Sequence, residues 1–197
     1  MQAVKERPVG FAEREGFSSY VGFTPPSTPA VVETTVTLRP NANGNQTDWN
    51  QYYTGAPGDY YNQVNEAIPD ENTSFVGCAY PYSAVLALFQ LDALPAGVLA
   101  ISSVKVGWRC RKTHAIGSGY VNIGLRTYTV SYYAGGNQFQ LTDYANYEAS
   151  WAVNPNTGLA WTVAEVNALQ AQIRGYPGSY RIYCTQVYAE VTYTYTP

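Results

Sequence analysis

Side chains that could do catalytic chemistry are few and scattered in this sequence. His114 is its single histidine, and it follows a strand-like segment at 101–112. The sequence holds no Gly-x-Ser-x-Gly nucleophile motif and no second base to complete a catalytic triad. One histidine with Cys78, Cys110 and Cys184 in separate strand-like segments does not form a zinc ligand set. We therefore expect a protein that is not an enzyme and that holds no metal ion or other cofactor.

A pair of carboxylates is the remaining catalytic possibility, because a glycosidase needs two facing acidic side chains. Glu33 and Glu190 lie on strand-like segments, but the alternation of polar and apolar residues places both on outward faces. The turn at 70–73, Asp-Glu-Asn-Thr, offers the oxygen ligands that calcium prefers. Its spacing fits no defined calcium loop, and a turn closed by the Asp70 side chain explains the same residues. We expect neither kind of site.

The composition is that of one folded domain with little charge. The chain has 197 residues, of which 13% are charged, against a usual fraction of about 25%. Nineteen tyrosines and frequent Gly and Pro favour an all-β protein with broad contact surfaces. A net charge of −3 gives no electrostatic basis for nucleic-acid binding. No apolar run has the length of a membrane helix, and the charged start MQAVKERPVG is unlike a secretion signal.

The three cysteines are expected to be small buried hydrophobic residues. Each lies inside a strand-like segment, and none forms a Cys-x-x-Cys pair. An odd number of cysteines without a secretion signal argues against a disulfide framework.

Charged residues are segregated along the chain. No basic residue lies between Arg39 and Lys105, whereas Lys105, Arg109, Arg111, Lys112 and Arg126 follow close together. One interpretation is that these are solvated strand faces and loops, as charge runs usually are. The other is that a basic face, including Arg109 and Arg111, meets an acidic face of a neighbouring subunit.

The longest strand pattern is at the C-terminus, over residues 181–195. It contains no Gly or Pro, and its alternation places Tyr183, Thr185, Val187, Ala189, Val191, Tyr193 and Tyr195 on one face. The opposite face, with Tyr188 and Glu190, is polar but nearly uncharged. Because solvent-exposed strands more often carry charges, we expect a neighbouring subunit or an arm to cover the end from Tyr188 onward. The predicted central partner of this strand is 101–112.

The remaining segments predict a sandwich. Strand patterns occupy 32–39, 74–80, 83–91, 120–133, 138–141 and 147–153, with turn residues at 40–45, 94–97, 134–137 and 154–158. The pattern at 120–133 is long enough for one bent strand or two short ones. A capping box at Thr162 and Glu165 begins a helix whose apolar stripe ends before Gly175. About eight strands with one short helix near the C-terminus predict an all-β, two-sheet antiparallel β-sandwich, a jelly roll, with the helix closing one end.

An extended N-terminal arm is predicted to precede this sandwich. Residues 1–31 hold no sustained periodicity, and a Pro-rich spacer lies at 24–30. Disordered tails are usually poor in aromatic residues, yet Phe11, Phe17, Tyr20 and Phe23 fall within thirteen residues. The sequence is compatible with a disordered tail and with an arm that docks its rings on another surface. The predicted division is an arm at 1–31 and a jelly-roll domain at 32–197.

Several segments together resemble virion structural proteins of tailed bacteriophages, which form jelly-roll, concanavalin-like modules. They lie at 38–40, 64–76, 89–113, 121–126, 141–147, 154–173 and 185–194, and NPNTGLAWT followed by VNALQ is the most distinctive. The resemblance covers 32–195 and leaves out the arm. It implies a virion component and carries no catalytic residues with it.

The function expected from these observations is a non-enzymatic capsid decoration (cement) protein on the particle exterior, made in the host cytoplasm. Its partners would be the major capsid protein or another virion protein and further copies of itself, taken as a trimer, with no nucleic acid and no membrane. The alternative is a carbohydrate-binding module of a tail or fibre, using Tyr and Trp residues of 48–65. The interface candidates are Phe11, Phe17, Tyr20, Phe23, Arg109, Arg111, Tyr188 and Tyr193.

Overall fold

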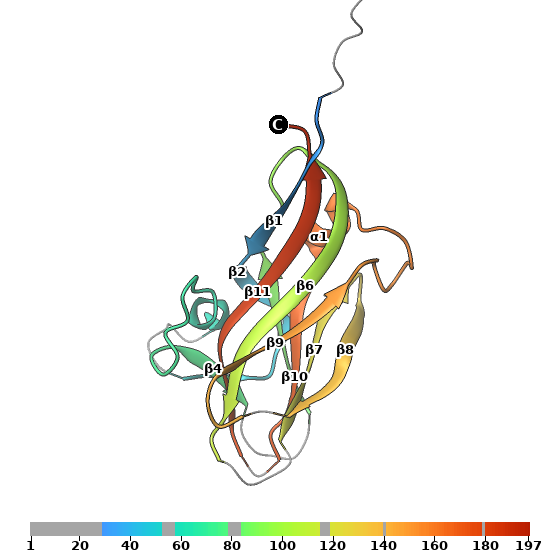
Figure 1. The fold of residues 1–197 in the computed structure, drawn as a ribbon. Coiled ribbons are helices and arrows are strands. Elements are labelled where there is room, and N and C mark those ends of the chain that lie inside the picture. The colour runs from blue at the N-terminus through green and yellow to red at the C-terminus, as the bar shows by residue number, and fades with distance from the viewer. Residues whose placement is uncertain (1–28, 53–57, 79–83, 115–118, 140, 179) are drawn as a thin grey trace, which may run out of the picture.

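The computed structural model describes residues 29–52, 58–78, 84–114, 119–139, 141–178 and 180–197. Within them the chain is all-β, as predicted, with two antiparallel sheets packed as a sandwich (Figure 1). One sheet has the order β3 (Asn50–Tyr52), β4 (Phe75–Cys78), β11 (Ile182–Tyr195), β6 (Val98–Lys112) and β9 (Ala145–Trp151), and β1 (Val32–Leu38) pairs with β11. The other has the order β2 (Pro40–Thr47), β5 (Val85–Leu91), β10 (Gln170–Tyr176), β7 (Tyr120–Thr127) and β8 (Val130–Phe139).

The strand pairs are nested in the order of a jelly roll. β1 pairs with β11, β5 with β10, β6 with β9, and β7 with β8, so that each pair encloses the next along the chain. The pairs β6–β11 and β7–β10 then join the nested hairpins into two sheets. This arrangement is a long hairpin rolled up on itself, and it confirms the predicted fold class.

The predicted pairing of the C-terminal strand with 101–112 is confirmed, but its predicted faces are only half right. β11 pairs with β6 along its whole length, with register shifts after Cys184, Thr192 and Thr194. Because a bulge at Thr185 adds one residue, the alternation changes phase there. Ile182 and Cys184 therefore lie in the core, with none of their surface exposed, although simple alternation placed them on the face opposite Val187. Tyr183 points away from the core and contacts the Phe75 ring.

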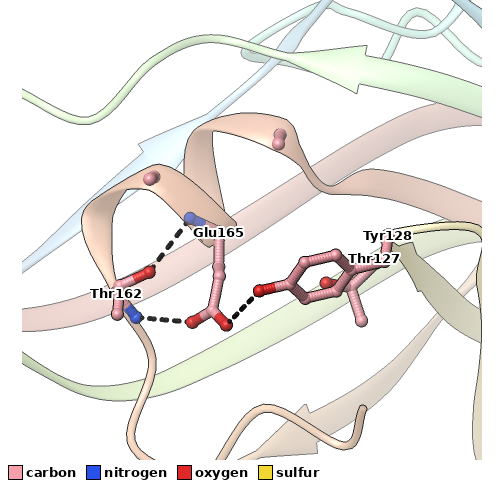
Figure 2. A pocket seen from close by; sticks show the side chains of 6 residues that line it. Thr127, Tyr128, Thr162 and Glu165 are labelled. Atoms are coloured by element: carbon pink, nitrogen blue, oxygen red, sulfur yellow. Dashed lines mark hydrogen bonds between the residues drawn. The ribbon is translucent and has the colours of Figure 1, made fainter. Parts of the chain in front are cut away.

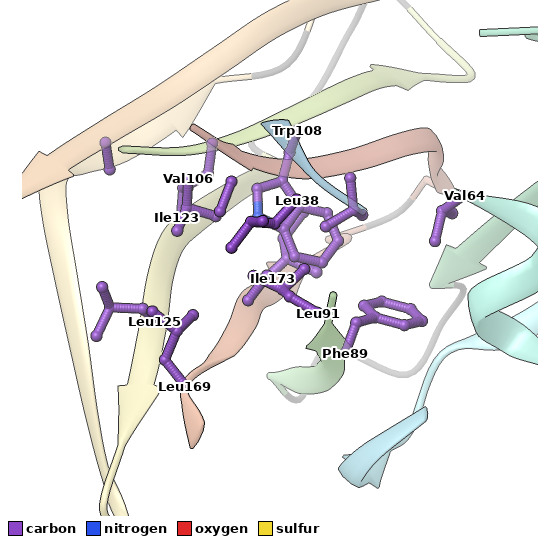
Figure 3. Packing of buried hydrophobic residues seen from close by; sticks show 14 of the residues in the cluster. Leu38, Val64, Phe89, Leu91, Val106, Trp108, Ile123, Leu125, Leu169 and Ile173 are labelled. Carbon is purple, nitrogen blue, oxygen red and sulfur yellow. The ribbon is translucent and has the colours of Figure 1, made fainter. Parts of the chain in front are cut away.

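Side chains from both sheets fill the space between them (Figure 3). Trp108 from β6 and Phe89 from β5 are fully buried, and their ring centroids are 5.8 Å apart. Ile173 from β10 is equally buried. Burying a side chain of this size stabilises the fold by roughly 1.5–3 kcal/mol. Cys78, Cys110 and Cys184 are free and buried, as predicted from their strand positions.

The predicted helix begins where expected but is much shorter. Its capping box is present at Thr162 and Glu165, and α1 covers only Val163–Ala168. Residues 170–176 form β10 instead, between β5 and β7. Leu169 and Ile173 are four residues apart, a spacing that fits a helical stripe and one face of a strand equally well. Residues 170–176 form a strand because they pair with β5 on one edge and with β7 on the other. Gly175 lies within this strand, and a Cβ added there would come within 2.7 Å of Cys78 Sγ.

Two predicted turns are strands. Residues 40–45 belong to β2, where Gly44 lies so close to β5 that an added Cβ would be 2.5 Å from the Leu88 Cβ. Residues 134–137 lie inside β8, and the β7–β8 turn is at 128–129, where Tyr128 has a φ of +58°. The predicted segment at 120–133 is two strands, one of the two alternatives that its length allowed, and 138–139 continues the second. Eight of the eleven described strands correspond to the predicted segments, and the other three are β2, β3 and β10. A 3-10 turn (η1) covers Tyr60–Gln63.

The predicted arm lies outside the described residues, and with it Phe11, Phe17, Tyr20 and Phe23. The first described strand, β1, begins at Val32. Within the residues described above, no helix combines the length and apolar character that crossing a membrane requires.

Candidate interaction surface

The outward-facing side chains of β1, β11, β6 and β9 form a broad polar surface, the outer face of the six-stranded sheet. Its polar character follows from the alternation of these strands, whose other side chains enter the core. In β6, for example, Val104 and Val106 are fully buried, while Lys105 between them points outward. This surface contains three of the predicted interface residues: Arg109, Arg111 and Tyr188.

Tyr188 lies across the neighbouring strand at the centre of this surface. Its partner residue on β6 is Gly107, and the partner of Gly107 on β9 is Glu148. A Cβ added to Gly107 would be 2.2 Å from the Tyr188 ring, so only glycine leaves room for the ring. The ring spans β6, and its hydroxyl donates to Glu148 Oε1 at 2.7 Å. Tyr188 is consequently buried, at 8% exposure.

A lysine between two glutamates continues this cluster. Lys105 Nζ lies 2.5 Å from Glu190 Oε2 and 3.3 Å from Glu148 Oε2. The hydrogen bond to Glu190 is the main reason that the pKa of Lys105 is raised. The hydrogen bond from Tyr188 is the main reason that the pKa of Glu148 is lowered. These shifts favour the charged forms of Lys105 and Glu148, and the contacts hold the side chains in place.

Arg39 lies over the ring of Tyr188. Its guanidinium lies 5.4 Å from the centroid of the Tyr188 ring, a cation–π distance, and burial lowers its pKa. Beside it is a shallow hollow of about 220 Å³, lined by Thr37, Arg39, Ala67, Pro69, Arg109, Asn146, Gln186, Tyr188 and Glu190. Burial also raises the pKa of Glu66, whose carboxylate accepts from Ser74 at 2.8 Å. The hollow is polar and open, and suits water or a polar side chain of a partner.

The two arginines of the predicted interface form hydrogen bonds with residues of the same chain. Arg109 Nε donates to Glu71 Oε1 at 3.0 Å, and its Nη1 donates to Asn146 at 3.2 Å. Arg111 donates to Asn72 at 3.0 Å, with its guanidinium 5.1 Å from the centroid of the Tyr144 ring. The acidic and basic segments of the sequence therefore meet within one subunit at these residues.

The same contacts account for the turn at 70–73. Asp70 accepts from the Ser74 backbone N–H at 3.1 Å, which closes the turn, and Glu71 has a φ of +56°. Glu71 and Asn72 are directed to the arginines of β6. Among the described residues, no group of three or more His, Cys, Asp or Glu side chains has an arrangement that could hold a metal ion.

The other predicted residues lie elsewhere. Tyr193 belongs to the core cluster, at 8% exposure, and so offers little area to a partner. Trp49, one of the rings considered for sugar binding, is 1% exposed and donates to the Val85 carbonyl at 3.2 Å. Tyr60 and Tyr61 pack against the core. Sequence reasoning missed Gly107 and Glu148; a glycine inside a strand pattern was the available signal of a close approach.

A second hollow lies beside α1 (Figure 2). It has a volume of about 240 Å³ and is lined by Thr127, Tyr128, Thr162, Ala164, Glu165 and Ala168. Its one carboxylate, Glu165, accepts from the Thr162 backbone at 2.9 Å and from the Tyr128 hydroxyl at 2.9 Å. The backbone hydrogen bond is the main reason that the pKa of Glu165 is lowered. These contacts hold the helix against the β7–β8 turn.

Comparisons with known proteins add little. No family model matches this chain, and no curated protein matches it. Among solved structures, the chain is similar to a chain in the cryo-EM structure of Broad Bean Stain Virus, with 14% sequence identity over 91% of each chain and a TM-score of 0.24. A likeness at this level is too distant to support either the fold or the function.

Proposed function

We propose that this chain is a non-enzymatic structural component of a virus particle, and specifically a decoration protein on the outside of the shell. The observation that carries the proposal is the jelly-roll order of its strands, an architecture that capsid and lectin domains use. The sequence resemblance to phage virion proteins supports the same role. Its partners would be the major capsid protein or another virion protein.

The distribution of side chains fits a protein that works through its surface. The space between the sheets is occupied by fully buried residues such as Phe89, Trp108 and Ile173. The outer face of the six-stranded sheet is instead polar, and its charged groups are paired in place. A surface whose side chains are already ordered loses little entropy when a partner binds. Such a surface suits permanent contact with a polar particle exterior.

The N-terminal arm is proposed to clasp the shell or a neighbouring subunit. Each buried aromatic ring contributes roughly 1.5–3 kcal/mol. Ordering the backbone costs roughly 1–2 kcal/mol per residue. Four rings together contribute roughly 6–12 kcal/mol, close to the lowest cost of ordering the thirteen residues from Phe11 to Phe23, so all four rings would be needed.

The test is particle binding by full-length protein whose arm has lost its rings. A variant with Phe11→Ser, Phe17→Ser, Tyr20→Ser and Phe23→Ser is expected to stay folded but no longer to cosediment with particles stripped of this protein. Deletion of residues 1–29 is expected to do the same. The control, Ser18→Ala with Ser19→Ala, leaves the rings in place and should bind normally. Unchanged decoration by the ring variant would contradict the proposed clasp.

A further inference from the structure

The outer edge of β1 is a strand edge that no described residue pairs with. β1 pairs with β11 over all seven of its residues, from Val32 opposite Tyr195 to Leu38 opposite Ala189. It forms a border of the six-stranded sheet in Figure 1. The backbone N–H and C=O groups on its other side are therefore directed away from the sheet. Such a row of groups is a template for a further strand.

Three of the other sheet borders carry features that discourage pairing, and β1 does not. β2 begins with Pro40 and pairs irregularly with β5. β8 contains Gly136 in a left-handed conformation, with a register shift against β7. β3 has only three residues, whereas the charge of Glu148 on β9 is directed onto the sheet, toward Lys105 and Tyr188. Prolines, bulges, short lengths and charges are the usual protections of an edge. β1 is regular, lacks proline and lysine, and is rich in β-branched residues.

The one charge of β1 is directed away from its free edge. Glu33 accepts from the Ser102 hydroxyl of β6 at 2.8 Å, across β11. Thr35, at the centre of the strand, is exposed, and its hydroxyl is bonded to the Thr192 hydroxyl at 3.1 Å. On the other face, Thr34 and Val36 are only half-buried. An added strand would cover these side chains without burying an unpaired charge.

We propose that β1 pairs with β1 of a second copy of this chain, antiparallel across a two-fold axis near Thr35. In this register Glu33 faces Thr37 of the second copy, and Thr35 faces its own counterpart. No like charges are opposed, because Glu33 is the only charged residue of the strand. The contact is self-complementary, as a two-fold interface requires. It joins the two six-stranded sheets into one continuous sheet and makes a dimer, rather than the trimer expected from the sequence.

Charge substitution at Thr35 tests this arrangement by sedimentation of the full-length protein over a range of concentrations. Wild type is expected to be a reversible dimer. Thr35→Lys and Thr35→Glu each oppose two like charges at the axis and should weaken the dimer by about fivefold or more. An equimolar mixture of the two variants should recover at least the wild-type association, because unlike charges then meet. Thr35→Val, which removes only the hydroxyl bond, should associate as wild type does.

The controls separate this contact from others. Thr142→Lys and Thr142→Glu change an exposed threonine outside the strands and should leave the dimer unchanged. Amide hydrogen exchange of residues 32–38 should slow as the protein concentration rises. Wild type that stays monomeric, or Thr35→Lys and Thr35→Glu variants that associate normally, would overturn the proposal. So would a dimer that depends on the rings of the arm and not on Thr35. None of these measurements uses particles, so the proposed virion role stands or falls separately.

Discussion

The Tyr188 hydroxyl of β11 donates to Glu148 of β9 at 2.7 Å, although β6 lies between these two strands. The contact exists because Gly107 of β6 has no side chain beneath the ring. It ties three strands together across the outer face of the six-stranded sheet. Lys105 forms an ion pair with Glu148, and the Arg39 guanidinium lies over the Tyr188 ring. The contact between Tyr188 and Glu148 gives the proposed interaction surface its shape.

Gly107→Ala is expected to lower the free energy of unfolding by about 1–3 kcal/mol, as overpacking usually does. The added Cβ would occupy the space of the Tyr188 ring, which must move and release Glu148. Urea unfolding measures the loss. In a Tyr188→Ala background the same substitution should cost much less, since the ring is gone. Equal costs in both backgrounds would show that the ring is not what Gly107 accommodates.

The pKa of Glu148 should rise toward its ordinary value in Tyr188→Phe, because the phenol is the main group that lowers it. A lowered pKa in the folded state means that the stabilisation is present above the ordinary pKa of 4.5 and is lost as the pH falls through the folded value. Carboxyl ¹³C NMR titration of wild type and variant measures the shift. The same Glu148 pKa in both proteins would contradict the assignment.

Thr162→Ala should lower the free energy of unfolding by about 1 kcal/mol, the usual cost of losing an N-cap. The Thr162 hydroxyl accepts from the Glu165 backbone at 3.2 Å, and α1 is too short to compensate by its own hydrogen bonds. Thermal unfolding checks this, with the exposed turn residue Thr129→Ala as the matched control. Equal stability of the two variants would mean that the capping box contributes nothing.

All three cysteine thiols should resist modification in the native protein. Burial raises the pKa of Cys78 to about 12 and raises that of Cys110 as well. The thiolate is the reactive form, so a disulfide reagent near pH 8 should react slowly until guanidinium unfolds the chain. Cys78→Ala should then reduce the titrated thiols from three to two. Rapid reaction of the native protein would contradict the burial of these thiols.

The sandwich could be predicted because its strands alternate and its turns carry Gly, Pro and Asn. The central partner strands, at 101–112 and 182–195, were identified by the same pattern. β10 was missed because the four-residue spacing of Leu169 and Ile173 fits a helix as well as a strand, although 170–174 alternates polar and apolar residues. The inward position of Ile182 was missed because nothing in the local sequence marks the bulge at Thr185.

The contacts of the candidate surface depend on strand register. Strand register cannot be read from the local sequence of either strand. Arg109 and Arg111 were identified as outward-facing, but their partners Glu71 and Asn72 come from a turn far away in the chain. Tyr188 was identified as a surface residue, and its burial follows from Gly107 on another strand. Alternation predicts which way a side chain points, whereas pairing decides what it meets.

Cryo-EM reconstruction of purified particles, with mass spectrometry of the same sample, tests whether this protein is a structural part of a virus particle. The chain is expected to copurify with particles, and a jelly-roll body is expected to fit density on the outer surface of the shell. Absence of the chain from purified particles that are otherwise complete would show that it is not a virion component.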